Sequence, residues 1–152
     1  MPAVTIRSAT PEDLPVLLEL YRQLSPGAEA SSAEDAVRGF QAMTDAAHVT
    51  LLVAEVDGLV AGTVTLVVVP NLTHGAKPWA QVENMVVEEN VRGSGVGKKL
   101  IEACLDTARA KGCYKVQLQS ANHRREAPHD AHAFYAAMGF EPSSVGFRRY
   151  FE

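Results

Sequence analysis

Three glycines at alternate positions, Gly93, Gly95 and Gly97, separate an apolar run from a helical pattern in the stretch "VVEENVRGSGVGKKL" (86–100). An arginine stands just before them, and two lysines follow directly after them. Glycine lets a backbone approach a ligand without a Cβ clash, and the N–H groups at a helix N-terminus attract anions. A plain strand-to-helix turn would need only one glycine. The stretch therefore predicts a strand, a phosphate-binding loop and a helix in direct succession.

The spacing of these glycines departs from two familiar nucleotide-binding motifs. The dinucleotide fingerprint G-x-G-x-x-G needs a third glycine where Lys98 stands. The Walker A pattern needs a glycine in place of Arg92 and a serine or threonine in place of Lys99. A protein that uses this loop for ATP or GTP is therefore disfavoured, and tight ATP binding would be needed to support it.

Hydrophobic periodicity and turn signals divide the chain into strands and helices. Asp57-Gly58 lies between two β-rich runs and predicts a hairpin, because both turn residues adopt positive φ. The expected strands cover 4–9, 49–56, 59–69, 80–88, 114–120 and 145–152, and the expected helices cover 11–24, 32–46, 96–111 and 130–139. This order predicts a mixed α/β sheet in a single domain, 1–152.

Composition narrows the class of protein. The 152 residues are 47% apolar and 21% charged, which suits a domain with a buried core. The formal net charge of −4 argues against nucleic-acid binding. No apolar run reaches the roughly 18 residues of a membrane span, and the first residues lack a signal-peptide pattern. Because Cys104 and Cys113 lack metal-ligand spacing, we expect reduced thiols in a cytoplasmic protein. His129 and His132 flank Asp130, but without further ligands we expect no metal site.

Several stretches together resemble one protein family. The stretch "RGSGVG" (92–97) matches the [QR]-x-x-G-x-[GA] element of the GNAT superfamily of acetyl-CoA-dependent N-acetyltransferases. The longer stretch "MVVEENVRGSGVGKKLIEACLDTARAKGC", the helix "AFYAAMGF" (133–140) and the start "TIRSATPEDLPVLLELY" are similar to the family's recurrent elements, so the resemblance covers nearly the whole chain. It implies the GNAT-like acyl-CoA N-acyltransferase fold, with a mostly antiparallel central sheet, a splayed parallel pair and helices on both faces.

The resemblance also implies where acetyl-CoA binds. A β-bulge usually splays the central strand from the next parallel strand in this family, and the thioester lies in the gap. The pantetheine arm is expected beside Met85, Val86 and Val87. The diphosphate is expected on the backbone of Arg92, Gly93, Ser94, Gly95, Val96, Gly97 and Lys98. The chain departs from the family pattern at Pro128, where many relatives carry a coenzyme-binding asparagine, and we expect extra residues around 127–130.

Acetyl transfer to a primary amine needs a base, because an alkyl ammonium has a pKa near 10.4, and benefits from an acid that protonates the leaving thiolate. The resemblance implies that Tyr135 is the acid, although its place on an apolar helical stripe is also typical of a core tyrosine. Glu83 is the candidate base in a direct attack within a ternary complex, with a solvated strand glutamate or a water chain as the alternatives. Gln119 stands where some relatives place a glutamate base, and an amide cannot act as one.

The acceptor is expected to be a small-molecule or protein amine, and the acidic balance favours a cationic one. The aromatic-rich strand 145–152 is similar to the C-terminal strands across which many relatives pair, so we expect a homodimer. A catalytically inactive coenzyme A-binding regulatory module of the same fold is the alternative. Retention of both Glu83 and Tyr135 argues against it.

Overall fold

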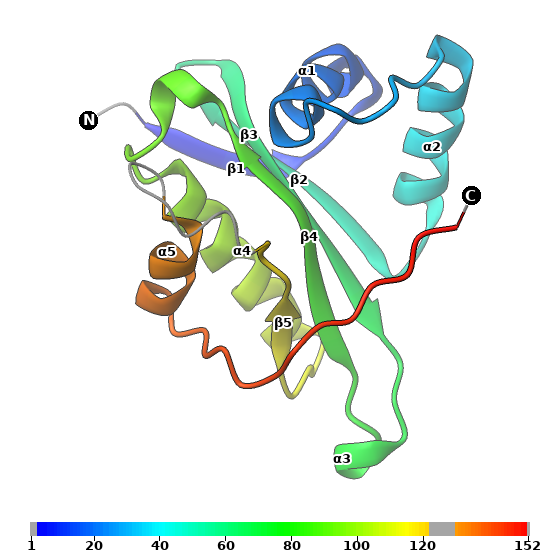
Figure 1. Ribbon diagram of the computed structural model, residues 1–152, viewed down its shortest axis with the longest axis vertical. Coiled ribbons are helices and arrows are strands. Elements are labelled where there is room, and N and C mark those ends of the chain that lie inside the picture. The colour runs from blue at the N-terminus through cyan, green and yellow to red at the C-terminus, as the bar shows by residue number, and fades with distance from the viewer. Residues whose placement is uncertain (1–2, 122–129, 152) are drawn as a thin grey trace.

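A five-stranded sheet with the order β1-β2-β3-β4-β5 forms the centre of the protein (Figure 1). The computed structural model describes residues 3–121 and 130–151. Its strands are β1 (Val4–Ser8), β2 (Val49–Val56), β3 (Leu59–Val69), β4 (Trp79–Val87) and β5 (Val116–Leu118). Its helices are α1 (Leu14–Leu24), α2 (Ala33–Asp45), α3 (Thr73–Ala76), α4 (Val96–Ala110) and α5 (Ala131–Ala137), with short 3₁₀ segments η1 (Pro11–Asp13) and η2 (Glu89–Val91).

The sheet is mostly antiparallel and ends in one parallel pair, as the sequence predicted. β1 to β4 pair antiparallel in chain order. The hairpin between β2 and β3 turns at Asp57 and Gly58, whose φ values of 52° and 81° are both positive. β5 joins β4 in parallel over three residue pairs only, and the last of them is Val82 with Leu118. Beyond that pair the two strands separate.

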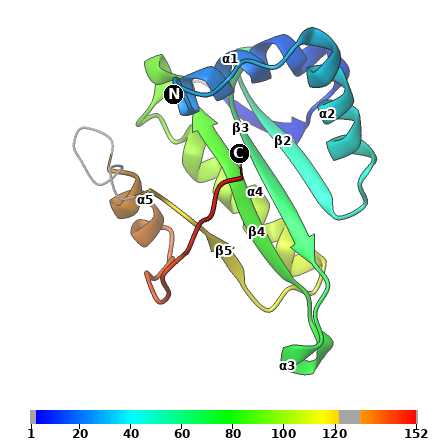
Figure 2. The ribbon, with the colours of Figure 1, turned by 45° about the vertical axis from the view of Figure 1, so that its right-hand side comes forward.

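Helices cover both faces of the sheet, because alternate residues of each strand point to opposite sides. Leu51 and Val53 of β2 pack with Leu17 of α1 and Phe40 of α2 on one face. Their neighbours Leu52 and Ala54 face α4 on the other face. Figure 2 shows α1 and α2 on one side of the strands and α4 on the other. Among the helices of the described part of the chain, none is long and apolar enough to cross a membrane.

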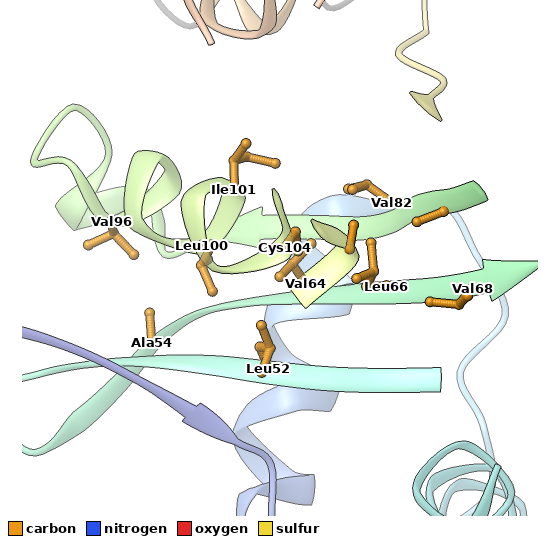
Figure 3. Packing of buried hydrophobic residues seen from close by; sticks show 12 residues of the cluster. Leu52, Ala54, Val64, Leu66, Val68, Val82, Val96, Leu100, Ile101 and Cys104 are labelled. Carbon is orange, nitrogen blue, oxygen red and sulfur yellow. The ribbon is translucent and has the colours of Figure 1, made fainter. Parts of the chain in front are cut away.

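The buried stripe of α4 fixes this helix against the middle of the sheet. The stripe repeats every three or four residues and is fully or nearly fully buried. A Cβ at Gly62 of β3 would lie only 3.1 Å from Leu100 Cδ1 and from Val96 Cγ1, so helix and strand approach as closely as glycine allows. Figure 3 shows Leu100 and Cys104 on the side of α4 that faces the strands. The residues of the stripe are Val96, Leu100, Ile101, Cys104 and Ala108.

The predicted last strand, 145–152, is wrong. Residues 140–143 and 145–151 form no helix or strand, and Phe147 and Phe151 are 92% and 90% exposed. Alternating aromatic and polar residues favour a strand only where a neighbouring strand pairs with them, and β5 has no such outer partner among the described residues. The predicted strand 114–120 shortens to β5 because Gln119 and Ser120 lie beyond its last pair with β4. The predicted loop 70–79 contains the short helix α3, and β4 begins at Trp79.

An ion pair ties β1 to the start of α1. The Arg7 guanidinium donates to both carboxylate oxygens of Asp13, at 2.7 and 2.9 Å, and its Nε donates to Glu55 of β2 at 3.0 Å. Asp13 also accepts from the Thr10 backbone N–H at 2.7 Å. Its side chain is 8% exposed. The Arg7 side chain, which donates these hydrogen bonds, is the main cause that lowers the pKa of Asp13 to about 2.

We expect Asp13→Asn to lower the free energy of unfolding at pH 7 by about 2 kcal/mol, from a pKa of 3.8 unfolded and about 2 folded. A lowered folded pKa stabilises the protein above the unfolded pKa, and this contribution disappears as the pH falls through the folded pKa. The difference between variant and parent should therefore shrink between about pH 4 and pH 2. Urea titrations at several pH values would measure it. Asp106→Asn, at an exposed pair, is the control, and an equal effect of both variants would contradict the assignment.

Candidate functional site

A cavity of about 550 Å³ opens where β4 and β5 separate. It begins at their last pair, Val82 and Leu118, and continues along both diverging backbones. The end of α1, the helix α5 and the C-terminal tail close its other sides. The lining residues are Leu24, Ser25, Pro26, Val82, Glu83, Asn84, Met85, Leu118, Gln119, Ser120, Ala121, Ala131, Tyr135 and Arg148.

A β-bulge in β4 accompanies this separation, as the resemblance to the family implied. Thr65 pairs with Glu83 and Thr63 pairs with Val86, so β4 carries one residue more than β3 over this step. Asn84, inside the bulge, has a φ of 49°. A bulge bends a strand and increases its local twist. The bend directs β4 away from β5, and beyond Val82 the edge of β4 that faces β5 has no strand partner in the described part of the chain.

The predicted diphosphate loop ends at an uncapped helix. Gly93 and Gly95 adopt φ values of 81° and 90°, and Gly95 is the N-cap of α4. No side chain of the described residues caps this helix. The N–H groups in its first turn have no acceptor within the helix. These N–H groups and the helix dipole attract anions, and the side chains of Lys98 and Lys99 are in the same turn.

The loop is fixed to β4 by side chains from both ends. Arg92 Nε donates to the Val87 carbonyl at 3.0 Å, so Arg92 braces the loop against the last residue of β4. The Ser94 hydroxyl donates to the Val91 carbonyl. A Cβ at Gly97 would lie 3.0 Å from Met85 Cε and 3.4 Å from Phe134 Cζ. The start of α4 thus packs directly against Met85, which also lines the cavity.

Glu83 is an exposed residue of β4 whose carboxylate lies at the wall of the cavity. Gln81 Nε2 donates to Glu83 Oε1 at 3.0 Å, and Gln117 Nε2 of β5 donates to Gln81 Oε1 at 3.0 Å. This chain of amides crosses the paired part of β4 and β5 and holds the carboxylate at the point where the strands separate. A carboxylate held in this way can attract an ammonium group or accept its proton.

Tyr135 lines the same cavity from α5. Its ring contacts Phe134 and Phe140 edge to face, with centroids 5.2 and 5.9 Å apart, so the half-buried residue also packs in the core. The helix is anchored at its start, where Asp130 accepts from the Ala133 N–H. His132 Nε2 lies 3.0 Å from the Ala121 carbonyl, just after β5. Both readings of Tyr135 from the sequence are therefore compatible.

The structure brings Glu83, Met85 and Tyr135 to one cavity, while Val86 is buried and Val87 contacts Arg92. Gln119 lines the cavity as a neutral residue. The departure from the family pattern at Pro128 lies in 122–129, outside the described residues, as does His129. No group of three potential metal ligands occurs among the described residues.

Two cavity residues escaped sequence analysis. Ser120 lines the cavity, and its hydroxyl is buried without a hydrogen-bond partner in the described part of the chain. Arg148 reaches the cavity from the C-terminal tail. No local pattern marks either residue, because a serine after a strand and an arginine in an expected strand are both ordinary.

The cysteines are poor candidates for a covalent step. Cys104 is fully buried in the stripe of α4, and burial raises its pKa to about 12. Burial also raises the pKa of Cys113. The thiolate is the nucleophilic form of cysteine, so neither side chain is activated for attack.

A model of the Acetyltransferase (GNAT) family matches residues 14–140. A glucosamine 6-phosphate N-acetyltransferase of Trypanosoma brucei brucei is 36% identical over 83 residues, which are 55% of this chain and 52% of that protein. The chain therefore spans about half the length of this curated relative. An aminoglycoside N(6')-acetyltransferase type 1 of Stenotrophomonas maltophilia is 30% identical over 91% of this chain and 87% of its own.

The solved structure of a putative acetyltransferase from Agrobacterium tumefaciens has the same fold. Its TM-score is 0.88 and its sequence is 38% identical, over 97% of this chain and 99% of that one. The aminoglycoside acetyltransferase and this solved structure each match more than nine tenths of the chain, and both are named acetyltransferases.

We expect Lys98→Glu to weaken coenzyme A binding at least about tenfold, because a charge-assisted contact near the diphosphate is replaced by repulsion. Lys98 is exposed, and its one ion pair within the described residues is with Glu102 at 3.8 Å, so the fold should tolerate the change. Calorimetry would measure the Kd. Lys111→Glu, at the other end of α4, makes the same charge change and should leave the Kd within twofold. An unchanged Kd for Lys98→Glu would place the diphosphate elsewhere.

Proposed function

The chain belongs to the GNAT acetyltransferase family, and we propose that it transfers the acetyl group of acetyl-CoA to a primary amine of a small molecule. The observation that carries this proposal is the cavity between the splayed strands, which holds Glu83 and Tyr135 together. Met85, which lines this cavity, also packs against Gly97 in the first turn of α4. The proposed diphosphate site and the cavity with the acid and base candidates are thus adjacent.

The residues fit acetyl-CoA. The unsatisfied N–H groups of the first turn of α4 would hold its diphosphate. The edge of β4 from Met85 to Val87, which β5 leaves unpaired, would hold the amide-bearing pantetheine arm. Acetyl-CoA supplies a thioester, whose carbonyl carbon an amine can attack directly. No cysteine of the chain is activated for an intermediate transfer step, which supports a ternary complex.

Glu83 takes the role of base. The acceptor arrives mostly as an ammonium ion and must lose a proton before it can attack. The Glu83 carboxylate attracts this cation and accepts its proton, directly or through water. The hydrogen bond from Gln81 fixes the carboxylate orientation.

Tyr135 takes the role of acid. Its hydroxyl donates a proton to the leaving thiolate as the carbon–sulfur bond breaks. The aromatic contacts with Phe134 and Phe140 hold the ring in place.

Both curated relatives are named for amines carried on sugars, one phosphorylated and one an aminoglycoside. We therefore propose an amino sugar as the acceptor. The unpaired cysteines Cys104 and Cys113 support a reducing, cytoplasmic location.

We also propose a homodimer. Half of the eight exposed large apolar side chains of the described residues lie on the tail, within 145–151. Such a concentration marks an interaction surface. A second copy presents the same surface and can cover it symmetrically. The four side chains are Val145, Phe147, Tyr150 and Phe151.

With amino sugars and acetyl-CoA, we expect coenzyme A release that depends on both proton-transfer residues. Tyr135→Phe should lower kcat about 100-fold, near the lower end for a general acid, since a thiolate leaves readily. Glu83→Gln should lower kcat/KM at pH 7, and the defect should shrink toward pH 9, because more amine arrives neutral. The Tyr135→Phe defect should show no such recovery. Thiol-detection kinetics from pH 6 to 9 would measure both.

Tyr114→Phe and Glu89→Gln are the matched controls, because neither residue lines the cavity. Full activity of both test variants across this pH range would assign proton transfer to other groups. Coenzyme A binding without turnover of any amine would instead favour the inactive regulatory module. Tight ATP binding without coenzyme A binding would favour a nucleotide-binding protein.

Light scattering at micromolar concentration should give a dimer mass that falls to the monomer mass when Phe147 and Phe151 are both changed to serine. The substitution removes two aromatic side chains from the proposed interface. Leu59→Ser changes a residue that is 74% exposed on the β2–β3 hairpin and should leave the mass unchanged. A monomer mass for the parent protein would exclude the dimer.

A further inference from the structure

Among the described residues that line the cavity, one is a cation and one is an anion. They are Arg148 and Glu83. Glu83 comes from β4, and Arg148 comes from the tail that follows α5. In the described part of the chain no carboxylate forms an ion pair with Arg148, in contrast to Arg7, Arg22, Arg38 and Arg109. The acetyl-transfer chemistry assigned above uses Glu83 and leaves Arg148 without a role.

Close packing of the tail places Arg148 at the cavity. A Cβ at Gly146 would lie 2.7 Å from Nε2 and 3.1 Å from Cδ of Gln119, so the tail backbone rests directly on this side chain of the cavity wall. Arg148 follows two residues later and lines the cavity as an exposed residue. Val145 and Phe147 do not line it and are 78% and 92% exposed. From 145 to 148, residues beside the cavity therefore alternate with residues that face outward. Figures 1 and 2 show it crossing β5 toward β4.

We propose that Arg148 binds an anionic substituent, a phosphate or a carboxylate, of the acetyl acceptor while the amine lies at Glu83. The inference rests on the proposed acetyl transfer and adds the class of acceptor, an amine that also carries an anion. A guanidinium binds phosphate or carboxylate oxygens through two parallel hydrogen bonds. A cavity of about 550 Å³ is within the usual range for small-molecule ligands.

The pair of opposite charges also disfavours other acceptors. A polycationic amine would satisfy Glu83 but would meet repulsion at Arg148, and repulsive contacts are a common source of specificity. An amino sugar without an anionic group would leave the guanidinium without a partner. Coenzyme phosphates are a competing anion, but the lysines beside the glycine loop line a second hollow of about 500 Å³ that shares no residue with the cavity.

The test compares matched acceptors that differ by one anion. Glucosamine and glucosamine 6-phosphate form the phosphate pair, and butylamine and 4-aminobutyrate form the carboxylate pair. The parent protein should prefer the anionic member of at least one pair in kcat/KM. Arg148→Ala should lower kcat/KM for that member about 10- to 100-fold, a range typical of a charge-assisted hydrogen bond. It should change the member without an anion less than twofold, with KM for acetyl-CoA unchanged.

Two further variants distinguish an effect of the Arg148 charge from a general structural effect. Arg148→Lys should recover part of the preference, because it keeps the charge but loses the bidentate geometry. Arg149→Ala removes the neighbouring tail arginine, which does not line the cavity, and should leave all four acceptors unaffected. An equal loss for both members of each pair would show a general structural role for Arg148. A raised KM for acetyl-CoA alone would assign Arg148 to the coenzyme. Either result overturns the proposal.

Calorimetry keeps this test independent of turnover. The same four compounds are titrated into the protein saturated with coenzyme A. An anion preference that Arg148→Ala abolishes supports the subsite, and the absence of any preference in the parent overturns it. Failure to acetylate any amine, with the anion preference in binding intact, would contradict the acetyl-transfer function and leave the anion subsite standing.

Discussion

The separation of β4 from β5 beyond Val82 and Leu118 is the constraint on which the rest of the site depends. One extra residue in β4, with Asn84 in a left-handed conformation, bends the strand away from its neighbour. Backbone groups that would otherwise pair across the sheet are left on two facing edges, and such groups need other partners. Continued pairing would close the cavity that Glu83 and Tyr135 share. The bulge therefore leaves a cavity where the two strands would otherwise form hydrogen bonds with each other.

Core packing fixes the start of α4 relative to the cavity at β4. Gly62 lets α4 lie against β3, and Gly97 lets the start of the same helix touch Met85 beside the cavity. Both contacts leave almost no free space, so the helix N-terminus has little freedom to shift relative to β4. Donors that are already fixed need no reorganisation when a charged group binds, which is the main source of electrostatic catalysis and of affinity for preorganised sites.

Local sequence patterns predicted the elements whose shape depends on near neighbours. The Asp57-Gly58 hairpin and the periodic stripe of α4 are as expected. Glu83 and Tyr135 line the same cavity because of tertiary packing, and the family resemblance was needed to anticipate this. The tail could not be placed, because its alternating residues fit an extended tail as well as a strand. Gly146 on Gln119, which brings Arg148 to the cavity, has no signature in the local sequence.

The tail also changes what the charge of the protein implies about the acceptor. A net charge of −4 favours cations in general, and the sequence led to that expectation. Charges separated by more than about 8 Å are largely screened at physiological ionic strength, so distant surface carboxylates contribute little inside a cavity. Glu83 and Arg148 line the cavity itself, where a bound molecule would meet their charges directly. In the proposed function these two side chains set the selectivity, because together they match an amine joined to an anion better than a simple cation.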